Sequence, residues 1–191
     1  MEINDDFLRQ RSEEVAFVKQ CIDDGKHIFA IGHSARLIIK LLGGNIVNLD
    51  EPVIGWYEIQ PIENLNESDF SIDNPVNVFC WQKQTLTIPD SVRRIAKSPT
   101  SNNALIQFGE NIICAEFLPN VSNGNDYVEH FGVDVKKGKF IQSKAELSNS
   151  NRKRQDAMHN LLDAILEFFT SKLEKRSRGS VPADNHSFTD C

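Results

Sequence analysis

The middle of this chain alternates β-forming segments with proline and glycine, and this alternation limits the folds that it can adopt. Branched and aromatic residues gather in residues 53–62 and 76–88, and a proline lies next to each end of both segments. Further β-forming pairs, 104–108 with 111–118 and 128–135 with 139–142, are separated by Gly109-Glu110 and by residues 136–138. Short glycine-containing connections of this kind are typical of β-hairpins. The pattern predicts a mainly antiparallel sheet.

Helical periodicity appears on both sides of this middle region. The spacing predicts a helix over 4–24, a buried strand over 28–31, a short helix over 35–42, a short strand over 45–49, a short helix over 91–97 and the longest helix over 144–176. The predicted class is therefore α+β, with an N-terminal helix-strand-helix unit, a mostly antiparallel central sheet and a long C-terminal helix. We expect one domain over residues 1–176 and a disordered tail over 177–191, where little can be buried.

Composition excludes several classes of protein. No apolar run approaches the roughly 20 residues that a membrane-spanning helix needs, and the acidic start does not match a secretory signal. The four cysteines show no zinc-type spacing, and three of them lie in apolar contexts. The histidines show no metal-binding spacing either. We therefore expect reduced thiols in a cytoplasmic protein, or a nuclear one if the source is eukaryotic, with no metal and no cofactor.

The most suggestive local feature is the turn after the strand over 28–31. Gly32, His33 and Ser34 link this strand to a helix, and Arg36 lies in the helix's first turn. Backbone N–H groups at a helix N-terminus, one hydroxyl and one guanidinium can bind a phosphate. The alternative is structural, with Gly32 making the turn and Ser34 capping the helix.

The same stretch resembles the sugar isomerase (SIS) family of phosphosugar isomerases. That family begins with a helix, a strand, a Gly-x-Gly-x-Ser loop and a helix, and Gly32 and Ser34 match part of its loop. The resemblance covers only these first elements. Residues 72–75, where the family has a second hydroxyl-rich phosphate loop, offer no hydroxyl, so no catalytic residue is carried over.

No catalytic constellation can be assembled from the sequence. The run Gly32 to Arg36 has arginine where a Gly-x-Ser-x-Gly nucleophile elbow has its final glycine, and no cysteine lies in an electropositive context. These negative observations favour a protein that is not an enzyme.

Charge and the C-terminal helix suggest a partner surface. Residues 1–75 carry a net charge of −8 and residues 136–178 carry +6. Leu162, Ile165 and Phe169 form an apolar stripe on the long helix, which could meet the core or a partner. The leading hypothesis is a non-enzymatic protein-interaction module, such as a small chaperone, adaptor or assembly factor, that binds another protein or a second copy. The alternative is a phosphate-ligand or phosphosugar-binding protein. A weaker alternative is contact with nucleic acid through Lys136, Lys137, Lys139, Arg152, Lys153 and Arg154.

Overall fold

The computed structural model describes residues 3–63, 65–66, 68–131, 138–149 and 151–179. Within them lie six helices, α1 (Asp5–Gln10), α2 (Ser12–Asp23), α3 (His33–Leu41), α4 (Gly124–His130), α5 (Lys144–Leu147) and α6 (Arg152–Gly179). The strands of the same part of the chain are β1 (Ile28–Ile31), β2 (Asn45–Pro61), β3 (Val76–Thr87), β4 (Val92–Ser98), β5 (Ser101–Phe108) and β6 (Ile112–Ala115). The predicted α+β class is confirmed.

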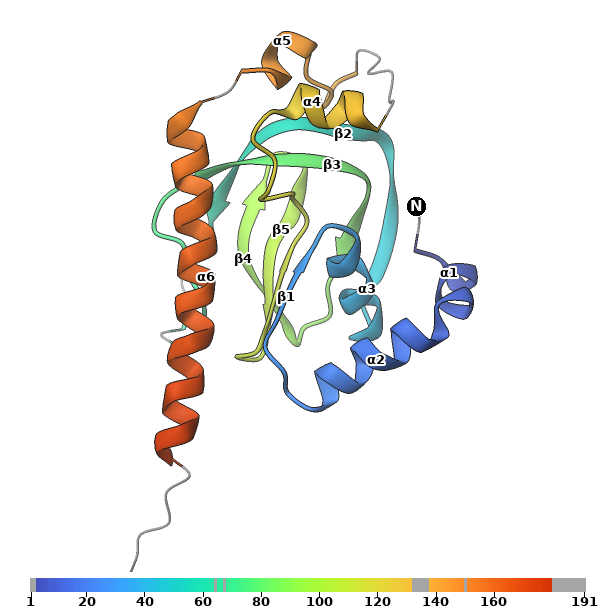
Figure 1. The fold of residues 1–191 in the computed structure, drawn as a ribbon. Coiled ribbons are helices and arrows are strands. Elements are labelled where there is room, and N and C mark those ends of the chain that lie inside the picture. The colour runs from blue at the N-terminus through green and yellow to red at the C-terminus, as the bar shows by residue number, and fades with distance from the viewer. Residues whose placement is uncertain (1–2, 64, 67, 132–137, 150, 180–191) are drawn as a thin grey trace, which may run out of the picture.

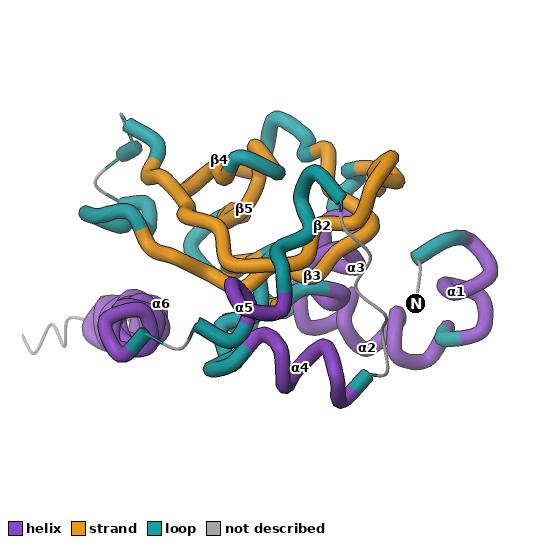
Figure 2. Tube along the Cα trace, turned by 90° about the horizontal axis from the view of Figure 1, so that it is seen from above, coloured by secondary structure: helices purple, strands orange, loops and turns teal. Residues whose placement is uncertain are grey.

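The strands form one curled sheet in the order β1-β6-β5-β4-β2-β3. Of these paired strands only β1 and β6 are parallel, and the other neighbours in this order are antiparallel. The sheet is therefore mostly antiparallel, as predicted. Figure 1 shows the long helix α6 lying alongside the strands, with α2 and α3 near β1 at the other side. Seen from above, α6, α4 and α2 line one side of the curled strands (Figure 2).

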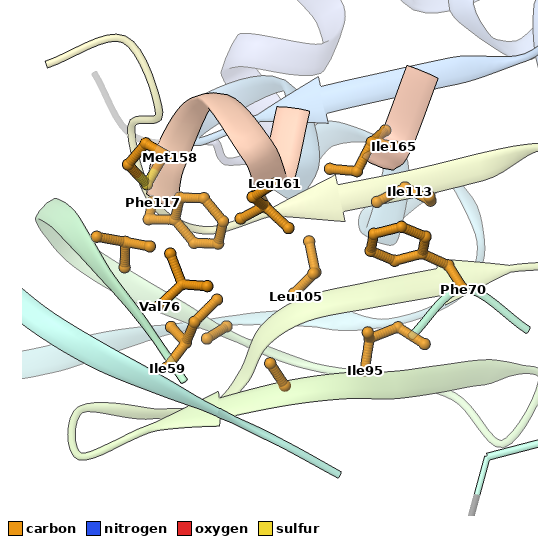
Figure 3. Close-up of a cluster of buried hydrophobic side chains, with 14 of the residues drawn as sticks. Ile59, Phe70, Val76, Ile95, Leu105, Ile113, Phe117, Met158, Leu161 and Ile165 are labelled. Carbon is orange, nitrogen blue, oxygen red and sulfur yellow. The ribbon is translucent and has the colours of Figure 1, made fainter. Parts of the chain in front are cut away.

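The core follows from the alternation of side chains along the strands. On β5 and β6, Leu105 and Ile113 face a cluster that α6 closes, whereas Ile106, Ile112 and Cys114 face α3. In the first cluster, Met158, Leu161 and Ile165 of α6 lie over the strands (Figure 3). Strand β6 is consequently buried on both faces.

Strand β1 forms where the sequence predicts it, but it lies at the end of the sheet. Its only hydrogen-bonded neighbour among the described strands is β6. Ala30 is buried, whereas Ile28, Phe29 and Ile31 are half-buried. The expectation of a strand buried on both faces is therefore met by β6 and not by β1.

Several predicted elements differ from the structure. The predicted helix over 91–97 is strand β4, because pairing with β5 buries Val92, Ile95 and Ala96. Residues 128–130, the start of a predicted strand, lie in helix α4, which Asn123 caps at its N-terminus. The rest of that predicted strand from residue 132 lies outside the described residues. The two predicted strands over 45–49 and 53–62 are one strand, β2, with an irregularity between Asn48 and Val53.

The predicted terminal helices are both divided. The helix over 4–24 is interrupted at Arg11, and the helix over 144–176 is interrupted between α5 and α6. Ser143 and Glu146 form a reciprocal capping box at the start of α5, which gives this short helix its own N-terminus. Helix α6 runs to Gly179, beyond the predicted end at 176, and the remainder of the predicted tail, residues 180–191, lies outside the described residues. None of the described helices is long and apolar enough to cross a membrane.

Candidate functional site

The connection between β1 and α3 consists of the single residue Gly32. Its backbone angles are φ 54° and ψ −108°, and α3 begins at the next residue. The Gly32 N–H donates to the Ala115 carbonyl at 2.7 Å, which fixes the turn beside the end of β6. A sharp strand-to-helix turn with strained angles is the geometry by which a nucleophile elbow lifts one side chain into a site. The structure therefore contains an elbow, and its apex is Gly32.

The residue opposite this apex is Leu118, which follows β6. A Cβ atom added at Gly32 would lie 3.4 Å from Leu118 Cδ2, so the two positions face one another across the site. The Leu118 N–H donates to the Phe79 carbonyl at 2.8 Å, which attaches this segment to β3. The group that faces the apex is therefore apolar and can neither donate nor accept a proton.

The three predicted site residues that follow Gly32, namely His33, Ser34 and Arg36, lie in different environments. Ser34 is exposed, and no side chain caps α3, so the alternative that Ser34 caps the helix is wrong. His33 is half-buried, and its ring meets the Phe7 ring edge-on at a centroid distance of 4.9 Å. Burial lowers the pKa of His33, and the charge of Arg36 lowers it further. Both effects favour the neutral form of the imidazole.

Arg36 points into the interior and not toward the turn's surface. Only 7% of it is exposed, and its Nη2 lies 3.4 Å from Gln82 Oε1 on β3. The structure therefore does not bring Arg36 and Ser34 together at the surface of the turn, because the guanidinium is buried and the hydroxyl is exposed.

A buried polar cluster lies behind the elbow, and sequence reasoning missed it. Glu116, directly after β6, is 3% exposed and accepts hydrogen bonds from Ser101 and, at 3.3 Å, from Thr85. Burial raises the pKa of Glu116 to about 7, although the two hydroxyls and Arg36 oppose that rise. Arg36 Nε and Glu116 Oε1 are both buried without a hydrogen-bond partner. Helix α3, which begins at the elbow, and the segment directly after β6 thus each contribute one ionisable group to this buried cluster.

The described cysteines do not supply a nucleophile to this site. Cys80 and Cys114 are buried in the core, and burial raises the pKa of each thiol to about 12. Cys21 is half-buried on α2. Among the described residues, no group of three or more His, Cys, Asp or Glu side chains could hold a metal ion.

The other predicted surfaces lie away from the elbow. Ile165 and Phe169 are 1% and 7% exposed and belong to the core, while Leu162 is half-buried beside them. The Arg154 guanidinium lies 4.2 Å from the Trp56 ring centroid, and the Lys139 ammonium lies over the Phe140 ring. The remaining members of the basic set are Arg152 and Lys153, which are exposed, and Lys136 and Lys137, which lie outside the described residues. A nucleic-acid role for them stays a prediction.

Comparison of this fold with solved structures finds glutamine amidotransferases. The enzyme from Methylobacillus flagellatus matches with a TM-score of 0.72 at 14% identity, covering 84% of this chain and 68% of that chain. The glutamine amidotransferase from Thermotoga maritima matches with a TM-score of 0.64 at 18% identity, covering 83% of this chain and 68% of that chain. A putative GMP synthase subunit from Thermoplasma acidophilum has a TM-score of 0.57 at 14% identity, covering 89% and 71%. No protein-family model and no curated protein matches the sequence.

This chain therefore has the fold of glutamine amidotransferase structures. That finding overturns the expected chaperone, adaptor or assembly factor, and it equally overturns the phosphosugar-binding alternative. The partial match to a Gly-x-Gly-x-Ser loop misled because it placed the functional group at Ser34, two residues after the apex. In the structure α3 begins at His33, two residues before the predicted start at 35, so Gly32 alone forms the turn.

Proposed function

We propose that this protein is a domain of glutamine amidotransferase fold that binds a carboxamide ligand of the glutamine type at its elbow and does not hydrolyse it. The observation that carries this proposal is Gly32 at the apex. Hydrolysis of an amide by acyl transfer requires a nucleophilic side chain and a base within hydrogen-bond reach. Gly32 has no side chain, and Leu118, which faces it, cannot accept a proton.

Such an elbow can still bind a ligand, because backbone N–H groups supply the hydrogen bonds. The first N–H groups of α3 have no partner within the helix, and they carry the positive end of its dipole. A carbonyl or carboxylate oxygen of the ligand can accept from these groups, as an oxyanion does in acyl-transfer enzymes. His33 and Ser34 directly follow the apex, and their side chains can add donors or acceptors beside a bound ligand.

Protein partners belong to the same proposal. One of the similar structures is a putative synthase subunit, so this fold occurs in chains that work with others. A domain that binds its ligand without converting it acts by passing the state of occupancy to a partner. We therefore infer a partner that recognises the occupied elbow.

The test measures glutamine binding by the wild type and glutamine hydrolysis by a double variant. We expect L-glutamine to raise the melting temperature of the wild type, by the equivalent of about 2.7 kcal/mol at 100 times Kd, while no ammonia is released above background. The double variant Gly32→Cys, Leu118→His installs a thiol and a base at facing positions, and it should release ammonia from glutamine. The matched control is Gly32→Ala, Leu118→His, which has the same backbone change without the thiol.

Two results would contradict the proposal. Release of ammonia by the wild type, with the same rate in Gly32→Ala, would show that a nucleophile acts elsewhere in the chain. Absence of any melting shift with millimolar glutamine or its carboxylate analogue glutamate would remove the ligand class.

A further inference from the structure

Helix α1 lies against the residue that follows the apex of the elbow. Its Phe7 ring meets the His33 ring edge-on at a centroid distance of 4.9 Å. His33 is the first residue of α3, and the N–H groups of this first turn are the ones to which the proposed ligand binds. Access to that ligand site therefore depends on α1, and this inference rests on the proposed function.

Few side chains hold α1 in this place. The helix has six residues, and Figures 1 and 2 both show it at the outside of the molecule. Of its described side chains Phe7 and Leu8 are half-buried and the others are exposed, and Ile3, which precedes the helix, is buried. A segment attached by so little buried apolar surface can open locally at a low cost in free energy.

A break in the helical backbone gives α1 a hinge. Arg11 separates α1 from α2, and its φ of −114° and ψ of 31° are not helical. No side chain caps the N-terminus of α2, and the ion pair between Arg11 and Glu14 lies on the surface, where such pairs add little stability. A change of the Arg11 backbone angles can therefore turn α1 away from α3 and leave α2 in place.

The His33 ring that Phe7 contacts carries an unsatisfied polar atom. His33 Nε2 is buried and has no hydrogen-bond partner. A buried nitrogen without a partner raises the free energy of the state that buries it. When α1 opens, Nε2 can bond to water or to a ligand, and this bond offsets part of the packing lost between the two rings.

We propose that α1 is a lid on the elbow, which turns at Arg11 to uncover His33 and closes again over a bound ligand. In the open state a ligand reaches the first turn of α3 and can bond to His33 Nε2 through a donor or an acceptor. A carboxamide carries both. Because a bound ligand satisfies Nε2, it favours the closed state over the same state without a ligand.

The first test needs no ligand. Diethyl pyrocarbonate modifies accessible neutral imidazoles, and burial and the charge of Arg36 both lower the pKa of His33. In the whole chain, mass spectrometry should show that His33 is modified at least about tenfold more slowly than His159, an exposed residue of α6. Phe7→Ala removes the covering ring and should bring the His33 rate to within about threefold of the His159 rate.

Matched variants separate a lifted lid from a general loss of structure. Phe17→Ala removes a ring of α2 that is 65% exposed, and it should leave His33 as slow as in the wild type. Phe7→Leu keeps an apolar cover and should also protect His33.

The hinge is tested with Phe7 in place. Arg11→Gly gives the hinge more conformational freedom and should raise the His33 rate at least about threefold. Its control is Glu14→Gln, which removes the Arg11–Glu14 ion pair alone and should leave the rate unchanged.

The last test joins the lid to the ligand. In Phe7→Ala, L-glutamine at 100 times Kd leaves about 1% of the sites free, so it should slow modification of His33 at least about tenfold and leave His159 unchanged. If His33 reacts as fast as His159 in the wild type, or stays slow in both Phe7→Ala and Arg11→Gly, the lid is overturned. Glutamine that raises the melting temperature without protecting His33 overturns the contact at Nε2 and leaves the proposed function standing. Glutamine that leaves the melting temperature unchanged overturns the proposed function, and the rates without ligand still decide whether α1 opens.

Discussion

Replacement of Glu116 by glutamine should make the protein more stable at neutral pH and remove the loss of stability that ionisation of Glu116 causes as the pH rises from about 4.5 to about 7. The carboxyl of Glu116 is almost fully buried, and burial raises its pKa from 4.5 to about 7. Glutamine has the same shape and keeps an oxygen that accepts from Ser101 and Thr85. The substitution therefore removes the charge and retains the hydrogen bonds that the structure shows.

The direction of this pH dependence follows from the protons bound by the folded and by the unfolded chain. Below about pH 4.5 the carboxyl is protonated in both the folded and the unfolded chain, and stability is at its full value. As the pH rises toward 7, the unfolded chain releases the proton first, so the free energy of unfolding falls. Above about pH 7 both states are ionised and the fall stops. At about 1.4 kcal/mol per pH unit, the total loss is about 3 kcal/mol.

Urea unfolding of the wild type and of Glu116→Gln at pH 5, 6, 7 and 8 measures this difference. The two proteins should have similar stability at pH 5, and the variant should be more stable by about 3 kcal/mol at pH 8. The control is Glu146→Gln, because Glu146 is exposed and the Ser143 hydroxyl and N–H lower its pKa, which gives the opposite direction of pH dependence. A wild type that gains stability relative to Glu116→Gln between pH 5 and 8 would refute the reasoning, since it would mean that the ionised pair with Arg36 stabilises the fold.

Two further predictions concern the packing around the sheet. Phe169→Ala should lower the free energy of unfolding by about 3–5 kcal/mol, because its ring is buried and packs against His27. Urea unfolding measures the loss, and a change below about 1 kcal/mol would place the ring outside the core. Gln142→Ala should lower the free energy of unfolding by about 2–3 kcal/mol, because the Gln142 amide accepts from the backbone N–H of Trp56 and donates to its backbone carbonyl, at 2.8 Å each. Thermal unfolding followed by tryptophan fluorescence would detect the loss, and an unchanged melting temperature would contradict the prediction.

Much of the fold could be predicted from the sequence because it depends on local interactions. The strand over 28–31 is recognisable from four consecutive apolar residues, and the β5–β6 hairpin from Gly109, whose φ of 55° suits glycine. The apolar period of 3.6 residues identified the long C-terminal helix, and four of its apolar residues, Met158, Leu161, Ile165 and Phe169, do face the core.

One of the elements that failed was decided by a partner distant in sequence. Residues 92–98 alternate poorly, and only pairing with β5, which buries Ile95 and Ala96, makes them a strand. Residues 128–130, predicted as the start of another strand, lie instead in helix α4, which the neighbouring Asn123 caps. For β4, short-range propensity was weak and tertiary packing determined the outcome.

The site shows the same division between local and tertiary information. The sequence by itself determined that a strand, a turn beginning at Gly32 and a helix follow one another, since that depends on neighbouring residues only. It could not determine that Leu118, 86 positions later, faces the apex, or that Arg36 and Glu116 share one buried cluster. Those relations exist because β6 pairs in parallel with β1, and parallel pairing joins strands that a long connection separates. The tertiary structure alone decided that Gly32 is the apex of an elbow and that Leu118 faces it.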